Sequence, residues 1–254
     1  MYQLHEVGFS VPSRILLHPL SATFQAGQVY GLVGHNGSGK STLIKLLAKQ
    51  QAPTTGQLLL NEQPMASWGA RAFAQTVAYL PQHLPAAPGL SVRDLVLMGR
   101  YAWHGLVGQY ARADFDQVDQ ALARTHTSAF ADALVDQLSG GERQRVWLAM
   151  CLAQNTQFLL LDEPLAALDM RHQIEVMALV KTLAHTLNLG IVVVLHDINL
   201  AAQYCDQILA LKGGALVHQG TPEEIMQPAT LADIYGLQLH LVPHPVTKAW
   251  VAVP

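Results

Sequence analysis

The chain has 254 residues, of which half are hydrophobic and 13% are charged, and its formal net charge is −3. This composition allows a large buried core, but the longest apolar runs are far shorter than the ~20 residues that a membrane-spanning helix needs. The weakly acidic balance, without a basic cluster, argues against nucleic acid as the main partner. Two cysteines without a CxxC spacing argue against a disulfide framework and fit a reducing compartment.

The N-terminal part of the chain is predicted to be rich in β-structure. Short apolar segments broken by proline and glycine indicate strands at Gln3–Phe9, Ile15–Leu17 and Val29–Val33. After a glycine-rich turn, leucines at helical spacing predict a helix over Lys40–Lys49. A further strand is expected at Gln57–Leu60.

The second half of the chain combines helices with two strongly apolar strands. Helical patterns follow a proline-rich stretch, at Val92–Met98 and Ala113–Arg124. The apolar strands Phe158–Leu161 and Ile191–Leu195 each lead into acidic residues or histidine. Continuous apolar strands alternating with helices predict a parallel sheet covered on both faces, and such sheets bind ligands at the carboxyl ends of their strands.

Residues 34–41 match the phosphate-loop pattern GxxxxGK[ST]. Glycines let consecutive N–H groups turn toward phosphate oxygens, and the following helix offers its positive N-terminal end. Lys40 is expected to reach the β- and γ-phosphates, and the Ser41 hydroxyl to coordinate Mg²⁺. A glycine-rich turn without a ligand is the alternative reading. The predicted nucleotide-binding residues here are Gly34, His35, Asn36, Gly37, Ser38, Gly39, Lys40, Ser41 and Thr42.

Polar residues at the ends of three other strands are candidates for catalysis. Asp162 is expected to hold Mg²⁺, and Glu163 to act as the general base for the attacking water, although acidic turns are common in isolation. His196 follows an apolar strand, where the γ-phosphate would lie; a lone histidine is more often a core residue. Gln82 follows the strand ending in AYL, and its amide can reach Mg²⁺ or the attacking water, while an ordinary loop glutamine is the alternative.

The sequence LSGGERQR at residues 138–145 indicates a second anion site at the start of a helix. Its predicted nucleotide-binding residues are Ser139, Gly140 and Gly141. With these residues the chain resembles the ABC ATPase family over nearly its whole length. The shared motifs, in chain order, are the phosphate loop at Gly34–Ser41, Gln82, LSGGE at Leu138–Glu142, LLLDEP at Leu159–Pro164, LD at Leu168–Asp169 and LHD at Leu195–Asp197.

The resemblance implies an α/β P-loop NTPase (RecA-like) fold in a single domain, residues 1–254. Its core, with a mostly parallel sheet and an N-terminal antiparallel β subdomain, would comprise residues 1–82 and 158–254. An inserted α-helical signature subdomain would occupy about residues 83–157. Two chains would pair head to tail, with each ATP between the phosphate loop of one chain and Ser139 of the other. Glu163 and His196 would support hydrolysis, and Asp169 would join the two sites.

Because the chain carries a single phosphate loop and no fused membrane domain, it resembles an importer subunit. HPLSATF, GRYAWHG and VLHDINLAAQYCD resemble the ATPases of iron(III)-siderophore importers, most closely the ferric hydroxamate branch. The resemblance implies ATP and Mg²⁺ as cofactors, transmembrane permease subunits as partners, and a periplasmic or surface substrate-binding protein acting through the permease. It places the chain peripherally at the cytoplasmic face of the inner membrane. A vitamin B12 or haem importer, a soluble non-transport ABC ATPase and a P-loop kinase are the alternatives.

Two aromatic features complete the predictions. Many family members carry an adenine-stacking aromatic residue where this chain has Val11, and strand alternation would turn Phe9 to the same face as a partial substitute. In importers of this family a short permease helix docks in a groove beside the helical subdomain. Tyr101 and Trp103 are candidates for lining that groove, with ordinary packing inside the subdomain as the equal alternative.

Overall fold

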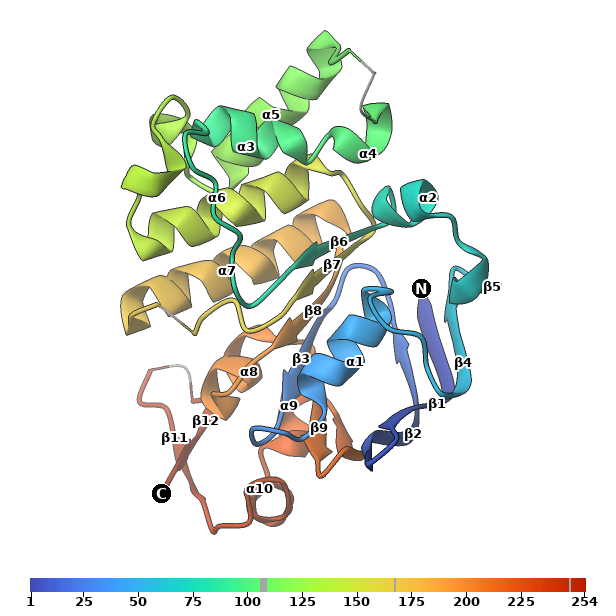
Figure 1. Ribbon diagram of the computed structural model, residues 1–254. Helices are drawn as coiled ribbons and strands as arrows, with labels where there is room; N and C mark the ends of the chain where they lie inside the picture. Colours follow the sequence, from blue (N-terminus) through green and yellow to red (C-terminus); the bar gives the residue numbers. More distant parts are fainter. Residues whose placement is uncertain (106–108, 167, 247) are drawn as a thin grey trace. The chain divides into compact units, whose positions relative to one another are not determined.

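The computed structural model describes residues 1–105, 109–166, 168–246 and 248–254 (Figure 1). Packing divides the chain into two units, one formed by Met1–Ser67 with Val180–Pro254, and the other by Trp68–Leu179. The predicted helical subdomain, about residues 83–157, lies inside the second unit, and its boundaries remain a prediction.

The N-terminal segment of the first unit folds into an antiparallel sheet in the order β2-β1-β4-β5. Its strands are β1 (Tyr2–Val11), β2 (Arg14–Phe24), β4 (Thr55–Leu60) and β5 (Gln63–Pro64). The buried Tyr2 side chain ties this sheet to the helix after the phosphate loop, because its hydroxyl donates to the Leu47 carbonyl at 2.9 Å. The predicted antiparallel subdomain is therefore confirmed.

The first unit also contains four neighbouring strands in the order β10-β9-β3-β8. They are β3 (Val29–Val33), β8 (Gly190–Val194), β9 (Gln207–Lys212) and β10 (Ala215–Gly220). β3 pairs in parallel with both β8 and β9, and every residue of β3 and β8 is buried. Continuous burial explains why these strands are apolar without alternation.

Helices and shorter segments complete the first unit. They are α1 (Lys40–Leu47), η1 (Met65–Ser67), α8 (Ile198–Tyr204), α9 (Pro222–Ile225), α10 (Pro228–Tyr235) and the hairpin β11 (His240–Pro243) with β12 (Trp250–Val253). Figure 1 shows β3 leading through a short turn into α1. This strand–turn–helix order places the phosphate-loop residues at the carboxyl end of a central strand.

The second unit is mainly helical around two parallel strands, β6 (Val77–Leu80) and β7 (Phe158–Leu161). Its helices are α2 (Ala70–Ala74), α3 (Val92–Met98), α4 (Tyr101–His104), α5 (Arg112–Arg124), η2 (Ser128–Phe130), η3 (Val135–Gln137), α6 (Gly140–Ala153) and α7 (Met170–Leu187), which contains the boundary between the units. Both α3 and α5 pack on α6. The predicted α/β P-loop NTPase fold with an inserted helical part is confirmed.

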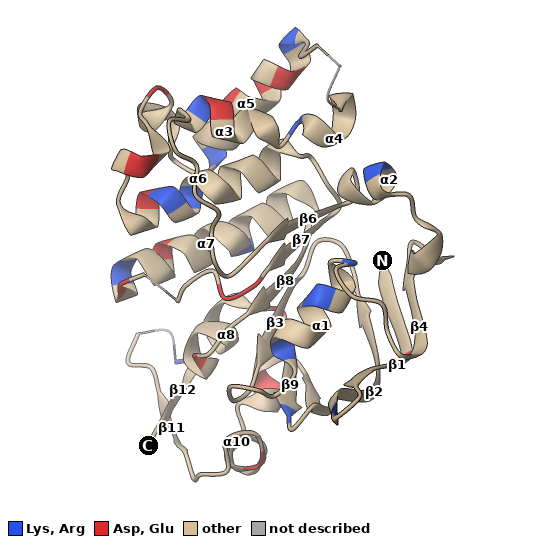
Figure 2. Cartoon of the chain, viewed as in Figure 1, with Lys and Arg blue, Asp and Glu red and all other residues tan. Residues whose placement is uncertain are grey.

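Charged residues are sparse along the strands and more frequent in helices and at strand ends (Figure 2). The segment directly after β7 is acidic in this view, as its sequence requires. Within the described ranges, none of the helices combines the length and apolar character needed to cross a membrane.

Trp103 packs inside the second unit. Its indole Nε1 donates to the Gln154 carbonyl at 2.8 Å, and the Arg100 guanidinium carbon lies 5.1 Å from the ring centroid. Tyr101 instead leaves 49% of its surface exposed. The contacts of Trp103 are those of ordinary packing, whereas Tyr101 keeps the exposure that a partner contact needs.

A buried ion pair holds α4 and α5 together. The Asp114 carboxylate is almost fully buried and accepts from Arg100 Nε at 2.8 Å, from His104 Nε2 at 2.9 Å and from the Ala111 N–H at 2.8 Å. Burial alone would raise the pKa of Asp114, but the hydrogen bonds from Arg100 and then His104 outweigh it and lower the pKa below 3.8. The ionised form is therefore the one that the folded chain stabilises.

We expect Asp114→Asn to lower the free energy of unfolding by about 3–5 kcal/mol, because it leaves the buried Arg100 charge without its partner. Because the folded-state pKa is depressed, the contribution of Asp114 is present above its unfolded value and is lost as the pH falls through its folded value. Urea unfolding of native and variant chains between pH 3 and pH 7 measures both effects. The control is Asp119, an exposed residue that lies on α5 like Asp114 and pairs with Arg93 of α3: Asp119→Asn should cost only about 0–1 kcal/mol. Equal losses for both variants would contradict the buried-pair explanation.

Candidate functional site

The loop between β3 and α1 has the backbone geometry of an anion cradle. Gly34, Gly37 and Gly39 have φ angles of 137°, 76° and 103°, in the region that other residues rarely adopt. A Cβ on Gly34 would lie 2.0 Å from the Leu211 carbonyl oxygen, so no side chain fits there. The Ser38 N–H donates to the His35 carbonyl, which closes the turn.

Two buried polar side chains in this loop test whether a phosphate group fits. Lys40 is 4% exposed, and its Nζ donates to the carbonyls of Gly34 at 2.7 Å and His35 at 3.0 Å. Ser38 is 3% exposed, and within the described part of the chain its Oγ has no hydrogen-bond partner. A buried hydroxyl normally has a partner. A phosphate oxygen would supply an acceptor for Ser38 and a counter-charge for Lys40, so the residues present fit a nucleoside triphosphate.

The remaining residues of the phosphate loop lie around this cradle. His35, Asn36 and Gly37 are exposed, whereas Ser41 and Thr42 are half-buried in the first turn of α1. The His35 ring reaches α10, where its Nε2 lies 2.9 Å from the Tyr235 carbonyl oxygen. The loop is therefore attached to a C-terminal helix of the same unit, a contact that the sequence pattern does not reveal.

His196 emerges at the same sheet edge as the phosphate loop. β8 runs parallel to β3, and the Leu195 N–H donates to the Leu32 carbonyl at 3.0 Å. The exposed His196 directly follows this contact, while Asp197 caps α8 by accepting from the Asn199 N–H at 2.7 Å. Neighbouring parallel strands thus place Gly34 and His196 at adjacent carboxyl ends.

In the second unit, the ends of β6 and β7 bring Gln82 and Glu163 into contact. The strands pair in register, with Leu80 opposite Leu161, so the residues after them lie side by side. Gln82 Nε2 donates to Glu163 Oε2 at 2.6 Å. Glu163 has a φ of 49°, a conformation that costs a non-glycine residue about 1–3 kcal/mol and is concentrated at functional sites. The carboxylate is therefore held in one orientation by both backbone and amide.

Asp162 is buried beside Glu163 and has a partner that the sequence analysis missed. The Tyr79 hydroxyl donates to Asp162 Oδ2 at 3.3 Å. Burial, and then the nearby Asp162 charge, raise the pKa of Tyr79 to about 12, so the hydroxyl keeps its proton and remains a donor. The signal available in the sequence was the spacing of Tyr79, three residues before Gln82 in a short apolar strand.

The LSGGE segment begins helix α6 with a reciprocal cap. Ser139 Oγ accepts from the Glu142 N–H at 3.4 Å, and Glu142 Oε2 accepts from the Ser139 N–H at 2.9 Å and from Ser139 Oγ at 2.6 Å. Gly140 is exposed and Gly141 is buried. This cap leaves the first-turn N–H groups of a 14-residue helix at its exposed start, which is the arrangement that binds anions.

The predicted Asp169 lies just before α7, where its carboxylate accepts from His172. Of the predicted site residues, the phosphate loop and His196 belong to the first unit. Gln82, Asp162, Glu163, Ser139–Gly141 and Asp169 belong to the second. The structure brings together Gln82 with Glu163, and each unit holds one predicted anion site.

The adenine-stacking prediction rested on alternation along β1, which the structure keeps from Phe9 to Val11. The pairing of β1 with β2 is irregular between Phe9 and Ser10, where Phe9 lies opposite Leu17 and Val11 lies opposite Arg14. The extra residue at this irregularity is Leu16 of β2, so the bulge does not turn Phe9 and Val11 of β1 to opposite faces. Phe9 and Val11 are both half-buried. That Phe9 stacks on adenine in place of an aromatic residue at position 11 stays a prediction.

A phosphate loop on a parallel-strand edge, with paired acidic residues following a second strand, defines a P-loop nucleoside triphosphatase. Residues 17–166, more than half of the chain, match the family model described as ABC transporter. The chain belongs to the ABC transporter family, as an ATP-hydrolysing enzyme.

Relatives over nearly the full length support the same family. The petrobactin import ATP-binding protein FpuD of Bacillus anthracis is 40% identical, with 94% of this chain and 88% of FpuD covered. The achromobactin transport ATP-binding protein CbrD of Dickeya dadantii is 39% identical, covering 98% and 93%. The hemin import ATP-binding protein HmuV of Streptomyces coelicolor is 40% identical, covering 95% and 85%.

Solved structures agree with the fold. A chain of a metal-chelate type ABC transporter in an inward-facing conformation superposes with a TM-score of 0.86 and 25% identity, covering 100% of this chain and 97% of that one. The ATP-binding cassette MJ0796, a dimer bound to ADP and phosphate in a post-hydrolysis state, gives a TM-score of 0.74 at 25% identity, covering 87% and 99%.

Proposed function

We propose that this chain is the ATPase subunit of an iron(III)-siderophore importer, with ferric hydroxamates as the cargo that its sequence favours. The observation that carries the cargo class is the 39–40% identity, over 94–98% of the chain, to subunits named for petrobactin and achromobactin transport. Cargo does not contact an ATPase subunit directly, so the cargo class rests on similarity to the relatives. The site itself supports only ATP binding and hydrolysis.

The site residues support a division of labour in ATP hydrolysis. Lys40 would bind the β- and γ-phosphates, while Ser41 and Asp162 would hold Mg²⁺. The Tyr79 hydroxyl, which donates to Asp162 Oδ2, would help to orient the Asp162 carboxylate. Mg²⁺ would neutralise the charge that develops on the phosphates.

Gln82 and Glu163 are placed to handle the attacking water. The Gln82 amide has both a donor and an acceptor, so its nitrogen can keep the bond to Glu163 while its oxygen turns toward Mg²⁺. Glu163 would accept the proton of the water. His196, at the end of the strand that pairs with β3, would donate to the γ-phosphate. Through its hydrogen bond to Glu163, a Gln82 side chain that moves on metal binding would change the position of the general base.

The second predicted anion site supports action in pairs. Ser139 and Gly140 are exposed at the start of α6, followed by the buried Gly141, on a different unit from the phosphate loop. We infer that they contact the γ-phosphate bound by a second copy, as two chains close head to tail around two ATP molecules. The dimer would act on permease subunits at the cytoplasmic face of the inner membrane, and a substrate-binding protein would deliver the cargo.

A pull-down of the tagged full chain from mild-detergent membranes, followed by mass spectrometry, tests the assembly. We expect a polytopic permease to be recovered, together with its substrate-binding protein. Recovery of nucleic acid or ribosomes without any permease would overturn the transport function. The Glu163→Gln chain should recover the same permease, because the substitution keeps the docking surface.

Iron uptake in a strain lacking this chain tests the cargo. Labelled ferric hydroxamate should enter only after the native chain is restored, and Glu163→Gln should fail to restore uptake. Haem is the second candidate, favoured by the 40% identity to a hemin import subunit. Restoration of haem uptake alone would support the ATPase function in import and would replace the siderophore by haem as the cargo.

A further inference from the structure

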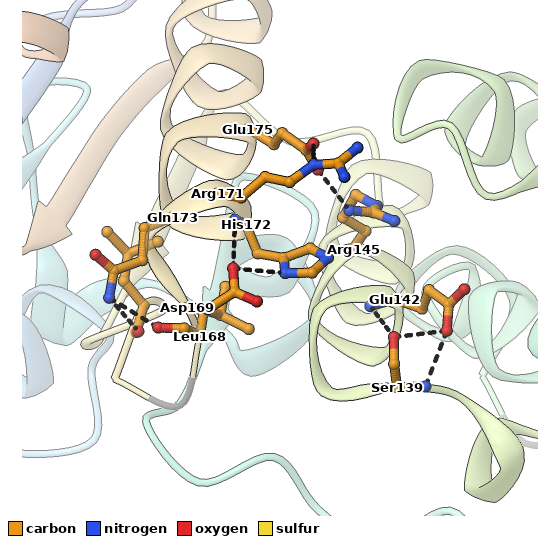
Figure 3. A network of polar contacts seen from close by, with 10 residues as sticks. Ser139, Glu142, Arg145, Leu168, Asp169, Arg171, His172, Gln173 and Glu175 are labelled. Carbon is orange, nitrogen blue, oxygen red and sulfur yellow. Dashed lines mark hydrogen bonds and ion pairs between the residues drawn. The ribbon is translucent and has the colours of Figure 1, made fainter.

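The segment Leu168–His172 lies against the start of α6, which carries the LSGGE residues (Figure 3). The His172 ring occupies the space that a side chain on Gly141 would need. A Cβ on Gly141 would lie 2.6 Å from His172 Cδ2 and 3.1 Å from Nε2. The ring and the Gly141 backbone are therefore in direct contact, and only glycine at position 141 allows it.

The same ring holds the Asp169 carboxylate. Asp169 Oδ1 accepts from the His172 backbone N–H at 3.0 Å and lies 2.8 Å from Nδ1 (Figure 3). A carboxylate that is ionised can only accept, so Nδ1 carries the proton. These bonds, first from the backbone and then from the ring, lower the pKa of Asp169. His172 thus contacts Asp169 through one edge of its ring and Gly141 through the other.

Other contacts make this arrangement rigid on both sides. Glu142 holds Ser139 through its N–H and its hydroxyl, and these bonds lower the pKa of Glu142, with smaller contributions from Arg145 and His172. On the other side of Asp169, Gln173 Nε2 donates to the Leu168 carbonyl at 3.0 Å (Figure 3). The Ser139 turn and the Asp169 loop are each fixed locally, and the His172 ring is the side chain that lies between them.

We propose that His172 is a positioning residue that sets the distance between the Ser139–Gly141 anion site and Asp169, so that both meet the partner copy together. The inference rests on the proposed function, because it requires a second copy of the chain with a bound nucleoside triphosphate. The first-turn N–H of Gly141 would face the γ-phosphate. A shift of the ring would move this donor or Asp169 out of register with the other chain.

The test uses ATP-driven dimerisation of the full chain in the Glu163→Gln background, where bound ATP is not consumed. Size-exclusion chromatography with ATP and Mg²⁺ should show a dimer for Glu163→Gln. Adding His172→Ala should raise the ATP concentration needed for dimerisation by about 10-fold or more. Adding His172→Asn should restore much of the loss, because its amide N–H can replace Nδ1 as the donor to Asp169.

Kinetics of the otherwise native chain provide a second readout. His172→Ala should lower kcat for ATP by about 10-fold to 100-fold, with KM within about 2-fold, since ATP first binds the phosphate loop of its own chain. Arg171→Ala is the matched control. Its 83%-exposed side chain pairs only with Glu175 among the described residues, so kcat and dimerisation should be unchanged. Thermal unfolding without nucleotide checks that all variants are folded.

The outcomes separate the two proposals. If Glu163→Gln itself stays monomeric with ATP, the proposed pairing fails and the role of His172 falls with it. If Glu163→Gln dimerises and His172→Ala changes neither dimerisation nor kcat, the pairing stands and the role of His172 is overturned. A loss in His172→Ala that His172→Asn does not restore would overturn the Asp169 bond as its cause.

Discussion

Glu163→Gln should lower kcat for ATP hydrolysis by about 10²-fold to 10⁴-fold, the range that a positioned general base contributes. Glutamine keeps the size of the side chain and can still bond to Gln82, but it cannot take a proton from water. The substitution should leave ATP affinity within about 3-fold, because it does not remove a phosphate contact. Steady-state phosphate release and binding of a fluorescent ATP analogue measure the two quantities.

The expected result has a distinct structural consequence. We propose that hydrolysis separates the pair, so a chain that binds ATP without hydrolysing it should accumulate as the closed dimer. Glu62→Gln, an exposed carboxylate in a turn of the first unit, is the control and should behave as the native chain. Hydrolysis at the native rate by Glu163→Gln would exclude Glu163 as the base and would shift attention to His196.

Lys40→Ala should abolish tight nucleotide binding. The ammonium would make charge-assisted hydrogen bonds to two phosphate groups, each contributing about 1.5–3 kcal/mol. Their loss should raise the Kd for ATP by roughly 10²-fold to 10⁴-fold. Isothermal titration with ATP and Mg²⁺ gives the change directly.

Two further variants separate the phosphate contact from local damage. Lys40 Nζ also bonds the carbonyls of Gly34 and His35, so its removal could disturb the loop itself. Lys40→Met keeps the apolar stem, so its thermal unfolding without nucleotide should stay closer to that of the native chain than Lys40→Ala does, while its Kd for ATP should rise as in Lys40→Ala. Lys45→Ala, on the same helix, should leave the Kd unchanged. Native ATP affinity in Lys40→Ala would disprove the assignment of this loop as the phosphate cradle.

The site motifs were predictable where the chemistry is local in sequence. The phosphate loop needs glycines with positive φ and a lysine at the start of a helix, and Gly34 and Lys40 are spaced accordingly. The contact between Gln82 and Glu163 was not visible from either motif alone. It arises because β6 and β7 pair in parallel register, which brings residues 81 positions apart within hydrogen-bond distance.

Two predictions about aromatic residues depended on neighbours that the sequence alone does not identify. Strand alternation placed Phe9 on the face of Val11; the pairing of β1 with β2 shifts between Phe9 and Ser10 through an extra residue in β2, and the adenine-stacking role of Phe9 stays a prediction. Trp103 was an equal candidate for a partner groove or for packing, and its bond to Gln154 shows that it packs within its own unit. In both cases a pattern of a few residues could not reveal which neighbours the folded chain would supply.

By itself, the sequence determined the family, the fold class and the candidate site residues, because motifs such as GxxxxGKS and LSGGE specify local turns and helix starts. Only the tertiary structure decided the partners of those residues: Tyr79 for Asp162, Tyr235 for His35 and His172 for both Asp169 and Gly141. The physical reason is that a partner across two elements is set by strand register and helix packing. These depend on the burial of many apolar side chains at once, and no short segment encodes them.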